Sequence, residues 1–186
     1  MTKTITISCN SGDCWANKNN DFGDGSPGYL YVIDNPGVSN SNVKTWLPFT
    51  IPLRRVTVEQ AYLKITPYAS GSDVGDLIFS CENATNPATP TTGADLNGRS
   101  LTSFAATLAM GTFTADVENT YQIDNPVQEV LNRSDWAGGS VLAVVIWENT
   151  IGDNTRQIYS YEGDASKRAK LVINYTELPT NMSYFY

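Results

Sequence analysis

The chain of 186 residues contains no histidine. That absence excludes His-based catalytic triads and dyads, and it also excludes His-ligated zinc or iron centres. No apolar run approaches the ~20 residues that a membrane-spanning helix needs, so we expect no membrane partner. Basic residues are few as well: 12 Lys and Arg stand against 19 Asp and Glu, giving a formal net charge of −7. Because phosphate backbones are bound by clustered cations, we expect no nucleic-acid partner.

Cysteine is scarce, and its spacing does not suggest a metal site. Cys9, Cys14 and Cys81 form an odd set, which we interpret as reduced, buried thiols. In an extracellular protein, a Cys14–Cys81 or Cys9–Cys81 disulfide is the alternative. The first ten residues lack the apolar core of a secretory signal, which predicts a cytosolic protein or a trimmed chain given a new Met.

Short segments of alternating apolar and polar residues dominate the rest of the chain. Predicted strands are 4–8, 29–33, 44–51, 58–68, 76–82 and 140–148, with two more at Phe113 and 121–123; the polar segments 17–28 and 83–98 are predicted loops. Pro48 and Pro52 place segment 44–51 at a sheet edge or a bulge. The continuous apolar run within 140–148 predicts a central strand that is buried on both faces.

Helical signals are limited to two places. Asn125 is a favourable N-cap residue, and Pro126 is favourable at the first helical position. Gln128 stands where the second residue of a capping box is expected. The short apolar stripe that follows predicts a helix plugging one end of a sheet. A weaker pattern predicts a second short helix at 103–110. Because strands prevail, the sequence predicts an all-β, jelly-roll-like antiparallel β-sandwich with one short helix. We expect a single domain over 1–175 and a C-terminal arm over 176–186.

The C-terminal half carries short motifs in a specific order. They are Val127-Gln128-Glu129-Val130, Asn132-Arg133, Trp136-Ala137-Gly138-Gly139, the apolar run from Val141, Tyr159-Ser160-Tyr161-Glu162-Gly163 and Ala169 to Tyr175. With these motifs the chain resembles, over about residues 25–175, the DNRLRE family of jelly-roll β-sandwich domains. That family is related to disaggregatase-type and carbohydrate-binding-module-like domains. The resemblance implies the same sandwich fold.

The same kind of sandwich is similar to virion proteins of tailed bacteriophages, which are made in the host cytoplasm. Because no export signal is visible, this likeness favours a structural virion component that decorates or cements the capsid. It implies the major capsid protein or other virion subunits as partners, and a homo-oligomer on the particle. The alternative is an extracellular carbohydrate-binding module or a host-glycan-binding fibre domain, with polysaccharide as its partner.

Both ends of the chain are candidate partner-binding segments. The chain after the last strand ends in three aromatics, Tyr184, Phe185 and Tyr186, whereas a free tail is normally polar. With Ile5 and Ile7 of the first strand, these side chains are predicted to bury apolar surface against a partner. Docking of the tail onto its own domain is the alternative.

Several aromatics at strand positions are candidates for binding a glycan. Trp15, Tyr29, Tyr31 and Trp46, with Tyr62 beside them, are rigid and amphipathic, as residues that stack on sugar rings are. The alternative is that they pack in the core or on a sheet face.

Catalysis would have to rest on a carboxylate pair, as in glycosidases. The only clustered loop acids are Asp21 with Asp24 and Glu162 with Asp164, and such exposed acids are usually solubilising residues. We therefore expect a non-enzymatic protein.

The pattern Asn-x-Asn-x-Asp at 17–21 is similar to the opening of a calcium loop. Phe22 stands where an EF-hand turn needs Gly, and Gly28 stands at the position of the bidentate Glu. We therefore interpret the segment as a surface loop and expect neither a metal nor a cofactor. The alternative is a calcium ion near Asp13, Asp21 or Asp24.

Overall fold

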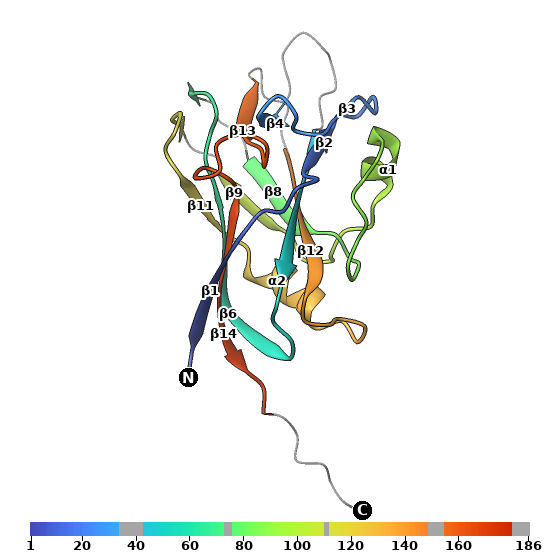
Figure 1. The fold of residues 1–186 in the computed structure, drawn as a ribbon, viewed down its shortest axis with the longest axis vertical. Helices are drawn as coiled ribbons and strands as arrows, with labels where there is room; N and C mark the ends of the chain where they lie inside the picture. The colour runs from blue at the N-terminus through green and yellow to red at the C-terminus, as the bar shows by residue number, and fades with distance from the viewer. Residues whose placement is uncertain (34–42, 73–75, 110–111, 149–154, 180–186) are drawn as a thin grey trace, which may run out of the picture.

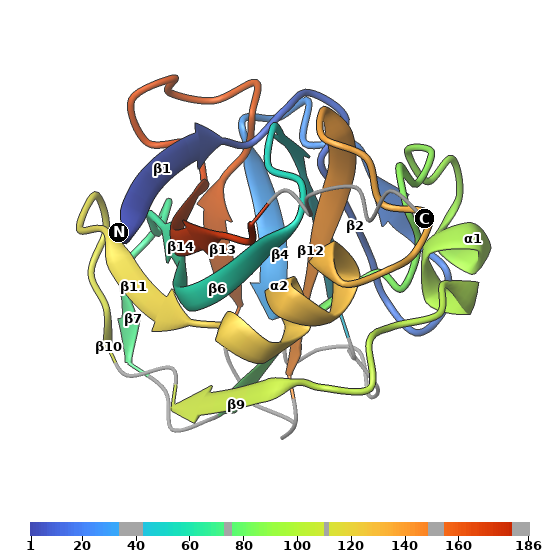
Figure 2. The same cartoon turned by 90° about the horizontal axis from the view of Figure 1, so that it is seen from below.

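The computed structural model describes residues 1–33, 43–72, 76–109, 112–148 and 155–179. In these residues, antiparallel strands form two main sheets that pack face to face, and two short helices lie outside the sheets (Figures 1 and 2). The predicted fold class, an all-β antiparallel sandwich, is confirmed.

The first sheet has four strands and contains both the first and the last strand. Its order is β1 (Lys3–Ser8), β14 (Lys170–Glu177), β6 (Val56–Ile65) and β11 (Asn119–Gln122). All six residues of β1 pair with β14, from Lys3 opposite Tyr175 to Ser8 opposite Lys170. The amino-terminal strand is therefore held in register by the carboxy-terminal one.

The second sheet has six strands. Its order is β3 (Phe22–Gly23), β2 (Cys14–Ala16), β5 (Lys44–Ile51), β12 (Ser140–Glu148), β8 (Asp76–Cys81) and β9 (Ala106–Ala109). Two smaller pairs complete the set: β7 (Gly71–Ser72) with β10 (Thr112–Phe113), and β4 (Tyr29–Ile33) with β13 (Arg156–Tyr159). The helix predicted at 103–110 is wrong, because Ala106 and Leu108 alternate toward the core and β9 pairs with β8.

The main core lies between the two sheets. Leu63 and Ile173 of the four-stranded sheet and Phe49 and Ile146 of the six-stranded sheet are fully buried in one cluster. Burying one such side chain contributes about 1.5–3 kcal/mol. In β6 and β14, the alternation of buried residues marks the face that meets the other sheet.

A smaller core covers the outer face of the six-stranded sheet. Ala143 and Val145 point away from the main core and pack with Trp46 and Leu96. Leu96 belongs to α1 (Gly93–Gly98), a helix that lies within the segment predicted to be an open loop. This cover explains why β12 is buried on both faces, as its continuous apolar run predicted.

Strand β5 is not at the sheet edge predicted from its prolines, since it pairs with β2 on one side and β12 on the other. The ladder to β2, however, ends at Trp46 opposite Cys14. Beyond it, the carbonyl of Pro48 accepts a hydrogen bond from the Asn10 N–H at 2.8 Å. An N–H at position 48 would point to the same side as this carbonyl. The β2 ladder has ended there, so proline at this position removes no hydrogen bond to β2.

Helix α2 (Asp124–Leu131) closes one end of the sandwich, as predicted, and Val127 and Val130 are buried against the core (Figure 2). The predicted capping box is wrong. Asp124 Oδ1 and Gln128 Oε1 instead accept hydrogen bonds from backbone N–H groups of β6, both at 2.5 Å. Neither described helix is long and apolar enough to cross a membrane.

Candidate functional site

The paired strands β4 and β13 carry tyrosines on their outer face. Tyr29 lies opposite Tyr159 in the ladder. The next pair is Leu30 opposite Ile158, and both of these side chains point into the core. The segment after β6 follows the other side of β13, because the Tyr68 N–H donates to the Gln157 carbonyl at 2.9 Å. The backbone therefore brings side chains from three segments to one surface.

Five aromatic rings form a continuous row on this surface, which we call the aromatic row: Trp15, Tyr31, Tyr29, Tyr68 and Tyr159. Neighbouring ring centroids lie 4.8, 5.5, 5.1 and 5.1 Å apart along it. The corresponding interplanar angles are 73°, 90°, 40° and 65°. These are the tilted and edge-to-face contacts that aromatic rings prefer. Tyr68 is the most open of the five, with 42% of its surface exposed.

The row's first ring is partly covered by the backbone of β3. A Cβ atom at Gly23 would lie 2.3 Å from the indole nitrogen of Trp15, so only glycine permits this close approach. Trp15 is half-buried and makes an edge contact with Tyr31. It therefore anchors the row, while the opposite end is more open.

The far end of the row meets three charged side chains. The Tyr159 hydroxyl donates to Asp116 Oδ1 at 2.8 Å, and Lys167 Nζ donates to the same oxygen at 2.7 Å. Lys167 Nζ also lies 4.7 Å from the Tyr159 ring centroid and 3.7 Å from Asp164. The hydrogen bond to Asp116 raises the pKa of Lys167, and the same contact lowers the pKa of Asp116. This end therefore offers a charged donor and a charged acceptor beside the half-buried ring of Tyr159.

The structure brings together three of the four residues predicted to bind a glycan. Trp15, Tyr29 and Tyr31 all belong to the aromatic row. Trp46 does not, and its inclusion is corrected: it is 1% exposed, and its indole N–H donates to Glu82 Oε2 at 2.8 Å. A ligand cannot stack on a ring in that position.

Tyr68 and Tyr159 were missed by the sequence reasoning. A local signal existed for Tyr159, since Gln157 and Tyr159 flank the buried Ile158 in the same alternation that marks β4. Tyr68 gave no such signal. Its place in the row depends on the pairing of its segment with β13, some 90 residues later in the chain.

A buried carboxylate lies where three loops meet, those before β2, after β3 and after β13. Asp13 is 1% exposed, and its Oδ2 accepts the Tyr161 N–H at 2.7 Å. Its Oδ1 has no hydrogen-bond partner among the described residues, and it faces the space beside Gly25 that Glu162 also faces. Burial raises the pKa of Asp13 to about 7; the Tyr161 N–H opposes this rise, and Glu162 adds to it. Protonated Asp13 can donate a hydrogen bond to Glu162, which would satisfy both groups.

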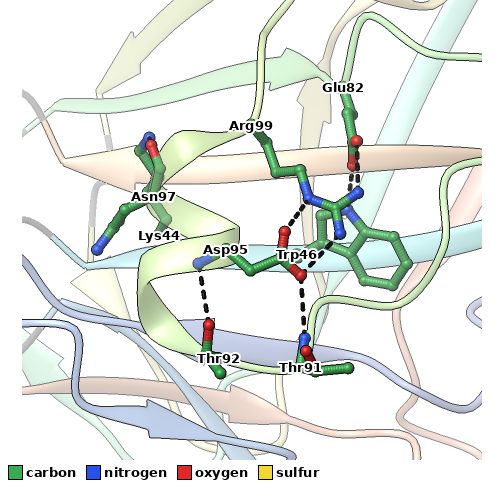
Figure 3. A network of polar contacts seen from close by, with 8 residues as sticks. All are labelled: Lys44, Trp46, Glu82, Thr91, Thr92, Asp95, Asn97 and Arg99. Atoms are coloured by element: carbon green, nitrogen blue, oxygen red, sulfur yellow. Dashed lines mark hydrogen bonds and ion pairs between the residues drawn. The ribbon is translucent and has the colours of Figure 1, made fainter.

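A second polar cluster fastens α1 to the six-stranded sheet (Figure 3). Arg99 donates to Asp95 through Nε at 2.8 Å and to Glu82 Oε1 through Nη1 at 2.9 Å. The other carboxylate oxygen of Glu82 receives the Trp46 indole N–H. The hydrogen bonds from Arg99 lower the pKa of Asp95. Since each charge in this cluster is paired, we interpret the cluster as structural: it holds α1 on the six-stranded sheet.

The calcium-like pattern at 17–21 folds as a self-contained turn. Asn17 Oδ1 accepts the backbone N–H groups of Asn19 and Asp21, and Asn17 Nδ2 donates to Asp21 Oδ2. Two of the oxygens that would face a cation, Asn17 Oδ1 and Asp21 Oδ2, are therefore used within the turn. Across the described part of the chain, no group of three or more His, Cys, Asp or Glu side chains could hold a metal ion. Cys9, Cys14 and Cys81 are buried free thiols.

The predicted partner-binding residues of β1 lie at the other end of the sandwich. Ile5 and Ile7 are half-buried and pack on the main core. Ile5 also lines a groove of about 630 Å³, the base groove, together with Leu53, Arg54, Arg55, Val56, Tyr175 and Leu178. Tyr184, Phe185 and Tyr186 lie outside the described residues.

No family model matches the chain, and no curated protein sequence matches it. Among solved structures, one match is the carbohydrate-binding module TmCBM61 in complex with beta-1,4-galactotriose. Its sequence identity is 7% and its TM-score 0.33, and the match covers 90% of this chain and 86% of that chain. A likeness of this size carries no conclusion about what the present chain binds. The resemblance to the DNRLRE family stays a prediction.

Proposed function

We propose that the protein is a non-catalytic glycan-binding protein that holds its ligand on the aromatic row. The observation that carries the proposal is the unbroken series of five rings from Trp15 to Tyr159. Tyrosine and tryptophan combine a rigid apolar face with a polar group. That combination suits a sugar ring, which presents C–H groups on its faces and hydroxyls around its edge.

The geometry of the row favours a single soluble glycan chain over a flat crystalline surface. Neighbouring rings are tilted by 40° to 90°, so no plane passes through all of them. A flexible oligosaccharide can follow such a row, because successive sugar units turn relative to one another. At the open end, Asp116 can accept a hydrogen bond from one sugar hydroxyl while Lys167 donates one to the next.

Removing the two rings at the open end of the row tests the proposal. We expect the double substitution Tyr68→Ala and Tyr159→Ala to weaken glycan binding at least about tenfold, equivalent to about 1.4 kcal/mol. Binding is measured by affinity electrophoresis in gels that contain neutral plant and bacterial polysaccharides, and by a glycan array. The matched control is Tyr62→Ala, a half-buried tyrosine on β6 of the four-stranded sheet, which should leave binding unchanged. Equal retention of both variants, or no retention of the unchanged protein, contradicts the proposal.

A structural role in a phage virion is the second candidate, and the base groove is the observation that favours it. The groove combines apolar side chains, among them the half-exposed Leu178, with charged ones at its rim, as protein interfaces do. This role predicts that the protein co-sediments with empty heads of a tailed bacteriophage. Leu178→Glu should abolish co-sedimentation, whereas Tyr68→Ala should not. If Tyr68→Ala abolished co-sedimentation and Leu178→Glu did not, particle binding would be assigned to the aromatic row instead.

A further inference from the structure

The base groove is an interaction surface that the glycan proposal does not use. Its floor is apolar: Leu53 and Val56 are buried, and Ile5 and Tyr175 are half-buried. Its volume of about 630 Å³ is within the range of specific binding sites. A second hollow of about 290 Å³ adjoins it and shares Arg54, Arg55, Val56 and Leu178. The two hollows form one continuous surface across the turn that contains the arginines.

Two exposed arginines stand on the rim of this groove. Within the described residues, neither Arg54 nor Arg55 takes part in an ion pair. Arg55 has a positive φ of 54°, which is unfavourable for a residue other than glycine by about 1 kcal/mol. Its carbonyl accepts the Leu178 N–H at 2.9 Å, so the end of β14 is tied to the strained turn. The fold thus holds two adjacent guanidinium groups beside an apolar floor.

This chemistry selects an aromatic occupant. Guanidinium groups stack on aromatic faces, and an apolar floor takes up the rest of each ring. Interface cores are enriched in tyrosine, phenylalanine and arginine for the same reason. In this chain, three consecutive aromatics occur once, at Tyr184, Phe185 and Tyr186. We propose that the base groove binds residues 180–186 of a second copy of this chain.

The direction of the chain beyond β14 supports binding to a second molecule. Leu178, the residue after β14, still lines the groove, and the chain that follows β14 points away from the body of the sandwich (Figure 1). The residue before a proline is biased to an extended conformation, which prolongs this direction. Because the chain leaves the groove at Leu178, it would have to turn back after Pro179 to lie in the groove of its own molecule. The groove and the segment are different surfaces, so changing either one should abolish association.

The test measures self-association of the full chain and binding of a synthetic peptide of residues 180–186. We expect the unchanged chain to gain mass with concentration in multi-angle light scattering. Substituting alanine for Tyr184, Phe185 and Tyr186 should leave a monomer that binds the peptide. In that background, Arg54→Ala with Arg55→Asn should weaken peptide binding at least tenfold, because asparagine tolerates a positive φ but lacks the guanidinium. Lys18→Ala, an exposed cation in the turn after β2, is the control and should have no effect.

A mixing experiment separates association between molecules from docking within one molecule. A chain with an intact groove and alanine at 184–186 should form a one-to-one complex with a chain whose groove arginines are replaced and whose aromatics are intact. The proposal is overturned if the unchanged chain stays monomeric and the peptide does not bind. It is also overturned if the unchanged chain stays monomeric while the alanine variant binds the peptide, because the groove is then filled by its own segment.

Discussion

Replacing Glu82 by glutamine is expected to lower the free energy of unfolding by about 3 kcal/mol. Glu82 is 4% exposed and accepts two hydrogen bonds, one from Arg99 and one from the Trp46 indole (Figure 3). Glutamine offers one acceptor oxygen, and its NH₂ group would face one of these donors. The expected loss of unfolding free energy is at the lower end of the range for a broken buried ion pair, because Arg99 keeps its contact with Asp95. Chemical denaturation followed by tryptophan fluorescence measures it.

The matched control is Glu118→Gln. Glu118 also joins two cations, Lys64 at 2.8 Å and Lys170 at 3.1 Å, but about a third of its side chain is exposed. Exposed ion pairs contribute about 0–1 kcal/mol, so this variant should unfold almost as the unchanged protein does. Similar losses for the two variants would show that burial of the cluster beneath α1 is not what makes Glu82 important.

Asp13 is expected to make the protein less stable as pH rises from about 4 to about 7. Its pKa is raised from 3.8 to about 7 in the folded protein, so folding favours the protonated carboxyl. The stabilisation is complete below the unfolded pKa and is lost as pH rises through the folded one. The loss amounts to about 4 kcal/mol. Urea denaturation at intervals from pH 4 to pH 8 should show this slope.

Asp13→Asn should remove the slope and make the protein more stable than the unchanged one at pH 8. The asparagine carbonyl can accept the Tyr161 N–H, and its NH₂ group can donate to Glu162, as protonated Asp13 does. The control is Asp24→Asn. Asp24 is exposed, and its pKa is lowered by hydrogen bonds from Ser26, so it contributes a slope of the opposite sign. If Asp13→Asn were less stable than the unchanged protein at pH 8, the charged form of Asp13 would be shown to stabilise the fold at that pH.

The sequence predicted strands well where burial alternates along a single segment. The stretches 56–65 and 76–81 form core-facing strands, since their alternating patterns report directly on the sheet. Contacts between residues that are far apart in the chain could not be predicted from such local patterns. Asp124 and Gln128 could not be recognised as partners of β6, whose N–H groups lie over 60 residues earlier.

The candidate site shows the same limit more clearly. Tyr29 and Tyr31 were identified as aromatics at predicted strand positions, and in the structure they alternate with buried residues of β4. Trp46 alternates just as well, yet its outer face is covered by α1 and held by Glu82, 36 residues away. Tyr68 joins the row only through its pairing with β13. A row assembled from four segments is a property of topology, so sequence reasoning found only part of it.

Ring-resolved NMR of the tyrosines tests the central claim most directly. The protein is titrated with the neutral oligosaccharide that binds best on the array, and the aromatic resonances are followed. Binding on the aromatic row predicts that Tyr29, Tyr31, Tyr68 and Tyr159 shift together, while Tyr62 on β6, which is not part of the row, stays unchanged. Shifts confined to Tyr62 or to Tyr175 in the base groove would contradict the account, and so would the absence of binding to any glycan.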